Sequence, residues 1–238
     1  MPHEAMNVQQ VARYLHLTAA EVEKLAERGD LPGRKAAKGW QFRKGQVDHW
    51  VETRLRELTH QRMAQIEKGV SLHHGMDPHA PIVEALIPRG GVLVPLPART
   101  RDAAIRCLVE AADRLGLVYD KNDLVEQVRH RETLCPTTLG PGIALPHPRH
   151  SLPYDIASSF IIVGRTDSGI PFGCPDGTLT RLFFLICCKD DRTHLHVLAR
   201  VSRILEEPII AALLQAADAD ELLAILHRRE QEILASER

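Results

Sequence analysis

Apolar residues near the N-terminus recur at the period of a helix and predict a small unit of short helices. The first helical pattern runs through NVQQVARYLHL, and a second follows with Thr18 placed to cap it and Gly29 after its last turn. Two glycine-containing turns and the alternating Trp40-Gln41-Phe42 then predict a short β-ribbon. A further helical pattern over 45–58 completes the order helix, turn, helix, ribbon, helix.

The regular pattern weakens between residues 58 and 80. The first part of this stretch can extend the preceding helix, whereas the remainder is rich in Gly, His, Asp and Pro, a composition typical of linkers. We therefore expect an N-terminal domain over 1–57, a linker over 58–80 and a second domain over 81–238.

Beyond residue 80, apolar runs alternate with helical patterns. Short apolar runs bounded by turn residues predict buried strands over 90–96, 158–166 and 181–188. Amphipathic patterns predict helices over 100–115 and 123–130, a long helix after the KDDRTH segment, and a last helix from 218. Strands that alternate with helices predict an α/β layered architecture.

The composition predicts a cytoplasmic protein without a membrane-spanning helix. The 238 residues are 44% apolar and 26% charged, and the formal net charge of −1 gives the whole chain no strong attraction for nucleic acid or anionic membranes. Five cysteines without a Cys-x-x-Cys pair indicate reduced thiols. The N-terminus has no apolar leader segment, and no stretch approaches the roughly 18 apolar residues of a spanning helix. We expect a soluble, cytoplasmic protein.

One segment of the N-terminal domain departs from this neutral balance. Residues 28–44 carry a surplus of basic side chains suited to phosphate contacts, with Asp30 alone against them. The basic residues are Arg28, Arg34, Lys35, Lys38, Arg43 and Lys44. The preceding helix begins with two alanines where a base-contacting helix needs donors, and its outward glutamates would repel a phosphate backbone: Glu21, Glu23 and Glu27. DNA binding and a role in protein contacts or dimerisation both stay open.

The order of elements over residues 6–51 resembles the excisionase/MerR-like family of small DNA-binding domains. The portion GDLPG…GWQFRKGQVDHWV is the most specific part of this resemblance. It implies a winged helix-turn-helix whose second helix enters the major groove and whose ribbon contacts phosphate. DNA is thereby implied as a partner.

Two motifs in the second domain carry a more specific resemblance. RHRETLCPTTLGPGIALPHPR occupies 129–149, and RTHLHVLARVSRIL occupies 192–205. Together they resemble the phosphotransferase-system EIIA domain of the fructose/mannitol type, including its nitrogen-regulatory branch, over about residues 81–230. The matching residues are Arg131, Glu132, Thr138, Gly140, Gly142, Ile143, Ala144, Leu145, Pro146, His147, Thr193, His194 and Leu195.

This second resemblance implies a mixed sheet flanked by helices and a phosphohistidine carrier. His147 would accept a phosphoryl group from the histidine of an HPr-like protein, with Arg131 and His194 as helpers. A downstream EIIB or a regulatory target protein would be a further partner, and no cofactor is implied. The chain would then be a phosphotransferase component with a regulatory link to DNA binding.

The residue types suit this chemistry. Imidazole is largely neutral near pH 7 and can act as a nucleophile, and Pro146 restricts the backbone that presents His147. The Arg131 guanidinium offers a fork of donors to phosphoryl oxygens, and His194 lies near a predicted helix N-terminus, which favours an anion. We expect His147 to be exposed at a strand end and His196 to lie at the surface or in a supporting position.

Other interpretations stay open on sequence alone. His147 can be an inert strand-end residue, Arg131 part of a solvated charged run, and His194 a helix cap. The histidines could ligate a metal, but no His-Glu-x-x-His or Cys-x-x-Cys spacing supports this, and we predict no metal site. The EIIA fold could also serve a non-enzymatic transcription regulator as a sensor or scaffold. Pro148 stands where the family usually has glycine, which stiffens the backbone after the acceptor.

Overall fold

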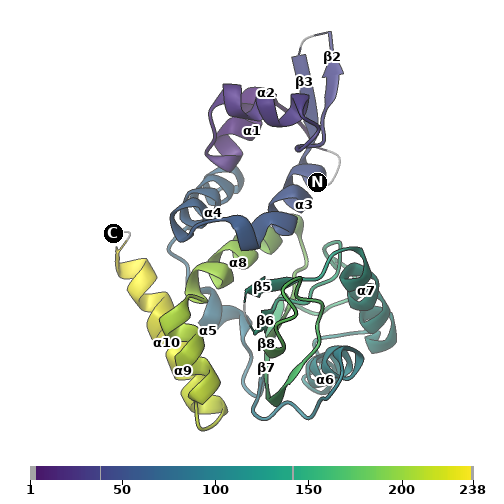
Figure 1. Cartoon of the computed structure of the whole chain (residues 1–238), viewed down its shortest axis with the longest axis vertical. Helices are drawn as coiled ribbons and strands as arrows, with labels where there is room; N and C mark the ends of the chain where they lie inside the picture. Colours follow the sequence, from purple (N-terminus) through teal and green to yellow (C-terminus); the bar gives the residue numbers. More distant parts are fainter. Residues whose placement is uncertain (1–3, 38, 141, 237–238) are drawn as a thin grey trace. The chain divides into compact units, whose positions relative to one another are not determined.

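The computed structural model describes residues 4–37, 39–140 and 142–236, and the chain divides into two compact units (Figure 1). The first unit combines Met1–Pro78 with Asp191–Arg203, and the second combines His79–Asp190 with Ile204–Arg238. A helix far along the chain therefore belongs with the N-terminal elements. This division differs from the expected domains over 1–57 and 81–238.

The first unit contains a small antiparallel sheet and the helices of a winged helix-turn-helix. Strand β3 lies between β1 and β2 and is antiparallel to both, so β2 and β3 form the predicted ribbon. The elements are β1 (Ala5–Asn7), α1 (Val8–Leu15), α2 (Ala19–Glu27), β2 (Arg34–Ala36), β3 (Gly39–Arg43), α3 (Lys44–Arg54), the 3₁₀ turn η1 (Leu55–Glu57), α4 (His60–His74) and α8 (Asp191–Ile204). The predicted winged helix-turn-helix is confirmed.

Local sequence explains where the first two helices begin. The side chains of Asn7 and Thr18 accept hydrogen bonds from the N–H groups of Gln10 and Glu21, at 2.9 and 3.2 Å. Gln10 and Glu21 bond back to the N–H groups of the capping residues, which completes two capping boxes. The predicted cap at Thr18 is therefore confirmed.

Helix α4 occupies most of the segment expected to be a linker. Thr59 caps it by accepting a hydrogen bond from the N–H of Arg62 at 3.2 Å, and Gly75 ends it with a φ of 65°. Met63, Ile66 and Val70 are buried along one face. The first part of 58–80 was expected to extend the preceding helix, and residues 60–74 instead form a helix of their own, because a narrow apolar stripe is enough to pack a helix whose other residues are polar.

Helix α4 packs closely on α1. A Cβ atom at Gly69 would collide with the carbonyl oxygen of Tyr14, so the two backbones meet where a larger residue could not fit. Tyr14 is itself buried, and its hydroxyl donates to Asp48 on α3 at 2.8 Å. The close approach at Gly69 thus packs α4 on α1, and the Tyr14–Asp48 hydrogen bond joins α1 to α3.

The second unit is built on a five-stranded mixed sheet in the order β4-β7-β8-β6-β5. β4 with β7 and β6 with β8 run parallel, whereas β7 with β8 and β5 with β6 run antiparallel. The elements are α5 (Ile82–Leu86), β4 (Val92–Leu93), α6 (Arg101–Arg114), α7 (Lys121–Leu134), β5 (Thr138–Gly140), β6 (Ile143–Ala144), β7 (Phe160–Ile170), β8 (Thr180–Cys187), α9 (Glu207–Gln215) and α10 (Ala219–Ser236). The expected α/β fold with a mixed sheet flanked by helices is confirmed.

Helices cover this sheet from both sides. Figure 1 shows α6 and α7 on one side of the sheet and α9 and α10 on the other. The core under α6 and α7 joins apolar residues of both helices to those of the central strands, with Leu108, Val128, Phe160 and Phe183 among them. The apolar runs are therefore the interior of the unit, as their pattern predicts.

Helix α10 holds the start of α5. The carboxylate of Glu230 accepts hydrogen bonds from the N–H groups of Ile82 and Val83 at 2.8 and 3.0 Å. A carboxylate at a helix N-terminus binds donors that have no partner within the helix.

No helix in the described part of the chain combines the length and the apolar character needed to cross a membrane.

Candidate functional site

His147 follows the short strand β6 at one edge of the second unit's sheet. β6 and β8 run parallel, with Ala144 paired with Phe183, so the carboxyl ends of both strands lie at the same edge. The N–H of Ile186 donates to the carbonyl of Pro146 at 3.0 Å, which continues the pairing up to the residue before His147. The chain leaves β8 at this edge through residues 188–190, and α8 begins at Asp191.

A backbone carbonyl sets the orientation of the His147 ring. The Nδ1 atom lies 2.7 Å from the carbonyl oxygen of Leu145. A carbonyl oxygen can only accept, so Nδ1 carries the proton and the neutral ring has its lone pair on Nε2. The residue is only 2% exposed, so the expectation of an exposed strand-end histidine is wrong.

The loop that presents His147 is tied to a buried carboxylate on α7. The N–H of Leu145 donates to the carbonyl of Thr137 at 3.0 Å, and the N–H of Thr137 donates to Glu132 at 3.2 Å. The Thr137 hydroxyl also donates to Glu132. Burial raises the pKa of Glu132 to about 7, although hydrogen bonds from Thr137 and the nearby Arg131 act in the opposite direction. Glu132 thus supports the backbone that positions His147.

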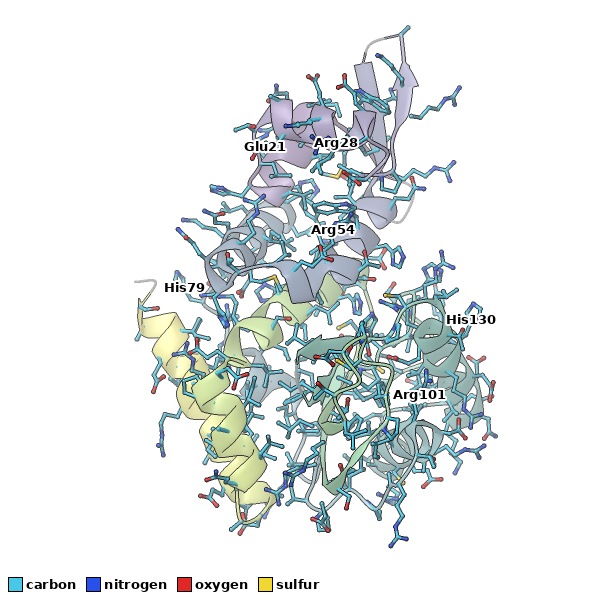
Figure 2. The ribbon with its side chains drawn as sticks, in the orientation of Figure 1. Glu21, Arg28, Arg54, His79, Arg101 and His130 are labelled. Carbon is cyan, nitrogen blue, oxygen red and sulfur yellow. The ribbon has the colours of Figure 1, made fainter. Side chains whose placement is uncertain are left out.

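Arg131 points into the second unit and not into solvent. It is 1% exposed, and its Nη1 donates to the carbonyl of Cys135 at 2.7 Å. Its Nε has no hydrogen-bond partner among the described residues. The neighbouring His130 is exposed on the outer side of α7 (Figure 2). The interpretation of Arg131 as part of a solvated charged run is therefore wrong.

His194 lies in the first turn of α8, as the sequence predicts, and belongs to the first unit. Its Nε2 is 3.4 Å from Oε1 of Glu52 on α3. The second oxygen of Glu52, Oε2, is 3.3 Å from Nδ1 of His49. Glu52 is not among the residues predicted for the site, because nothing in its local sequence indicates a partner more than a hundred residues away.

His196 is buried beside α4, so the surface position proposed for it is wrong. Its Nδ1 lies 3.1 Å from the hydroxyl of Ser71 and 3.7 Å from Glu67. Burial lowers the pKa of His196 to about 4, and the positive charges of Arg200 and Arg203 act in the same direction. The ring is therefore neutral at physiological pH and serves packing and hydrogen bonding.

The structure places His147 and Arg131 in the second unit and His194 in the first. Within the second unit, Glu132 is a further residue of the candidate site, and its motif position was its only signal in the sequence. The arrangement around His147 offers a neutral imidazole of fixed tautomer on a loop held at the edge of the sheet.

The candidate DNA-contacting residues fall into three groups. Arg28, Arg34, Lys35 and Arg43 are exposed, and the first of these lies directly after α2 (Figure 2). Lys35 also lies over the ring of Trp40, with its Nζ 5.9 Å from the ring centroid. Lys38 lies outside the described residues.

Lys44 forms the third group and corrects the prediction. It is 1% exposed, and its Nζ binds Oδ2 of Asp48 at 2.6 Å, while its ammonium group lies over the ring of Tyr14. A buried lysine paired with a carboxylate is not available to a DNA phosphate. Lys44 therefore stabilises the junction of the ribbon and α3.

The outer face of α2 is acidic, as the sequence indicates. Glu21, Glu23 and Glu27 are all exposed. Hydrogen bonds from the backbone and side chain of Thr18 lower the pKa of Glu21, so its negative charge is retained at the helix start (Figure 2). Within segment 28–44, the exposed positive charge is accordingly on the ribbon and at Arg28.

Comparison with known families agrees with both resemblances. Residues 86–229 match the family "Phosphoenolpyruvate-dependent sugar phosphotransferase system, EIIA 2", and residues 5–55 match a helix-turn-helix domain family. The chain belongs to the EIIA type 2 family. Its EIIA region contains α8, although that helix lies with the helix-turn-helix domain in the first unit.

Individual relatives support the same assignment. A nitrogen regulatory protein of Bradyrhizobium diazoefficiens is 32% identical over 136 residues, which cover 55% of this chain and 87% of that protein. The fructose-specific EIIABC component of Bacillus subtilis is 26% identical over 152 residues, but the chain spans only 24% of its length. A solved complex of enzyme IIA-Mtl with phosphorylated enzyme IIB-Mtl from Escherichia coli matches at 25% identity and a TM-score of 0.53, covering 58% of this chain and 95% of that chain.

Proposed function

We propose that this EIIA domain is a phosphohistidine carrier and that Nε2 of His147 is the acceptor atom. The observation that carries the proposal is the hydrogen bond between Nδ1 and the Leu145 carbonyl, because it fixes the tautomer whose lone pair is on Nε2. The proposed donor is the phosphohistidine of an HPr-like protein.

The transfer balances without a proton leaving His147. The Nε2 lone pair attacks phosphorus, the bond from phosphorus to the donor's ring nitrogen breaks, and that nitrogen leaves with the electron pair. The Nδ1 proton stays on the ring, hydrogen-bonded to the Leu145 carbonyl, so the phosphorylated ring is a cation beside a dianionic phosphoryl group. A carbonyl acceptor stabilises that cationic ring better than it stabilises the neutral one.

Arg131 and His194 are the proposed helpers. The transferring phosphoryl group carries charge on its equatorial oxygens, and a preorganised cation lowers the barrier. Arg131 supplies a guanidinium with an Nε donor that has no partner among the described residues. We propose, from its place in the family motif, that the imidazole of His194 donates to a phosphoryl oxygen.

We further propose that the helix-turn-helix domain binds DNA and makes the carrier regulatory. Arg28, Arg34, Lys35 and Arg43 are exposed and would contact phosphates, and Lys38 stays in this set on sequence grounds. The relative named as a nitrogen regulatory protein supports a regulatory role. An EIIB protein is one proposed downstream acceptor, because the E. coli relative was solved with phosphorylated IIB.

A second candidate function is a non-enzymatic transcription regulator in which the EIIA fold is a sensor or scaffold. The low exposure of His147 favours this alternative, because a phosphoryl donor has to reach Nε2. Both functions use the same fold and the same helix-turn-helix domain. The two functions differ in whether the chain accepts a phosphoryl group.

The test incubates the full chain with phosphoenolpyruvate, enzyme I and an HPr-like protein, and follows intact mass. We expect the wild-type chain to gain one acid-labile phosphoryl group and His147→Ala to gain none, because no other ring would replace the positioned Nε2. His150→Ala is the matched control, since it removes an exposed histidine three residues away. A wild-type chain that stays unmodified would support the sensor or scaffold.

A further inference from the structure

A continuous chain of hydrogen bonds joins a buried carboxylate of α7 to the ring of His147. The N–H and the hydroxyl of Thr137 donate to the two different carboxylate oxygens of Glu132, the N–H at 3.2 Å. The carbonyl of Thr137 accepts from the N–H of Leu145 at 3.0 Å, and the carbonyl of Leu145 accepts from Nδ1 of His147 at 2.7 Å. All four residues belong to the second unit. The orientation of the ring therefore depends on how firmly Glu132 holds Thr137.

The contact between Glu132 and Thr137 fits an ionised carboxylate. Both groups of Thr137 act as donors, and each binds a separate oxygen that accepts. A protonated carboxyl carries a hydrogen on one oxygen, so it offers this pair of donors one good acceptor in place of two. Hydrogen bonds to a charged acceptor are also roughly twice as strong as those between neutral groups. Ionised Glu132 thus holds Thr137 more tightly than protonated Glu132.

The proton of this carboxyl exchanges with solvent near neutral pH. Glu132 is 2% exposed, and burial raises its pKa to about 7. The hydrogen bonds from Thr137 lower the pKa, and so do two guanidinium groups, that of Arg131 on the same helix and that of Arg101 at the start of α6. Burial is the larger effect, so both forms of Glu132 are populated at neutral pH.

We propose that Glu132 is a positioning residue for phosphoryl transfer, acting through Thr137 and Leu145, and that loss of its proton speeds acceptance by His147. Ionisation releases the proton to solvent and strengthens the hold on Thr137. The loop then keeps Nδ1 of His147 on the Leu145 carbonyl and the lone pair on Nε2. This inference rests on the proposed function, and it makes the rate of transfer depend on pH through a residue that acts by way of the backbone.

The test measures the rate of transfer from a phosphorylated HPr-like protein to the full chain as a function of pH. Glu132→Gln keeps the size of the side chain and is neutral at every pH, so it stands in for the protonated form. The ratio of the wild-type rate to the Glu132→Gln rate cancels the titration of the donor and of His147 itself. We expect this ratio to rise from about 1 below about pH 6 to about 10 above about pH 8, with its midpoint at about 7.

Glu126→Gln is the matched control. It makes the same substitution on the same helix, at a carboxylate whose side chain is 68% exposed. The ratio of the wild-type rate to the Glu126→Gln rate should stay near 1 at every pH. If Glu132 has a merely structural role, Glu132→Gln is slower by a factor that does not change with pH.

Two further measurements follow the route from Glu132 to the ring. Thr137→Val removes a hydroxyl that lowers the pKa of Glu132, so in this background the midpoint of the same ratio should move to higher pH. The NMR shifts of the ring nitrogens of His147 at about pH 8 should show a smaller fraction of the Nδ1–H tautomer in Glu132→Gln than in the wild type. An unchanged midpoint or an unchanged tautomer fraction would overturn this route.

The outcomes also separate this inference from the proposed function. A wild-type chain that takes no phosphoryl group overturns the proposed function and this inference with it. A phosphorylated wild type whose rate ratio to Glu132→Gln is the same at all pH values overturns this inference alone. Circular dichroism of each variant at each pH shows whether the rates compare folded proteins.

Discussion

The two units bury charged groups in different ways. In the first unit, buried charges bind one another: Glu67 with Arg200 and Arg203, and Asp48 with Lys44. In the second unit, the groups of the candidate site are bound by neutral partners. Glu132 accepts from Thr137, Arg131 donates to the carbonyl of Cys135, and the His147 ring donates to that of Leu145.

This difference indicates what each set of charges is for. Ion pairs neutralise each other, so those of the first unit fix helices in place and offer little to an incoming group. A side chain oriented by a carbonyl or a hydroxyl keeps its own charge or lone pair. The second unit therefore holds its candidate reactive groups in fixed orientations through neutral hydrogen-bond partners.

The largest expected effect is on stability, at the centre of the first unit's network. Glu67→Ala leaves Arg200 and Arg203 buried without their carboxylate, and removal of one partner from a buried pair costs about 3–5 kcal/mol. Urea unfolding of the full chain measures the loss. Glu57→Ala should change the free energy of unfolding by less than about 0.5 kcal/mol, since that side chain is exposed. A loss of similar size in both variants would contradict the structural role of the network.

The next effect is a pH dependence from Glu132 in the second unit. Its pKa is raised from 4.5 to about 7, so the folded state holds the proton more tightly than the unfolded state. The contribution of Glu132 to the free energy of unfolding is fully present below pH 4.5 and is lost as pH rises through about 7. The loss is about 3 kcal/mol at most. Urea unfolding from pH 4.5 to 7 should show the wild type losing up to this amount relative to Glu132→Gln, a comparison in which the opposite contribution of His196 cancels.

His196 in the first unit changes the free energy of unfolding with pH in the opposite direction, and it serves as a control for this measurement. Its pKa is lowered from 6.5 to about 4, so its contribution is present above pH 6.5 and is lost as pH falls towards 4. Between pH 4.5 and 6.5 the contributions of His196 and Glu132 oppose each other, so His196→Gln should make the fall in stability with rising pH steeper. Parallel curves for wild type and Glu132→Gln would show that Glu132 is not a buried acid.

A change of rate is expected from Arg131. Arg131→Ala removes a cation from the transferring phosphoryl group and should slow phosphorylation of His147 by about 100-fold, without abolishing it. Rapid-quench measurement of the phosphorylated fraction gives the rate. Arg129→Ala, on the same helix but paired with Asp102 and Glu126, should transfer at close to the wild-type rate. Equal rates in the wild type and Arg131→Ala would remove Arg131 from the site.

The smallest effect concerns the exposed charges of the ribbon. Lys35→Ala should weaken DNA binding similarly for all DNA sequences. It should also reduce the slope of log affinity against log salt concentration by about one. Affinity for a selected operator at several salt concentrations gives this slope. Lys121→Ala, which removes a lysine of the second unit, is the control. An unchanged slope in Lys35→Ala would exclude a phosphate contact at this residue.

Much of the fold follows from local sequence. The caps at Thr18 and Thr100, the glycine after α2 and the apolar runs of β7 and β8 depend on neighbouring residues or on burial of whole segments. These features are visible in a single sequence because each is set by contacts close in the chain or by hydrophobicity alone. The predicted elements therefore agree with the structure in type, but 60–74 form a separate helix, and β1, α5, β5 and α9 were not predicted.

The errors share a physical cause, which is that they depend on partners far along the chain. A lysine next to a basic ribbon resembles a DNA contact, and only the fold shows that Lys44 lies beneath Tyr14 and binds Asp48. The helix that carries His194 and His196 was predicted, but their contacts with Glu52 and Glu67 join residues more than 125 positions apart. Burial of His147 likewise cannot be derived from its own segment.

The attachment of α8 to α4 bears on how such a protein could arise and be divided. A gene fusion usually joins modules that fold independently and can be exchanged. Here Glu67, which lies between the two regions matched by the families, binds Arg200 and Arg203 on the EIIA helix α8, so the start of the EIIA match is not a boundary of the fold. Cutting the chain near residue 80 would separate this carboxylate from both guanidinium groups. A fragment that begins there would keep the two arginines of α8 and lose the carboxylate that binds them.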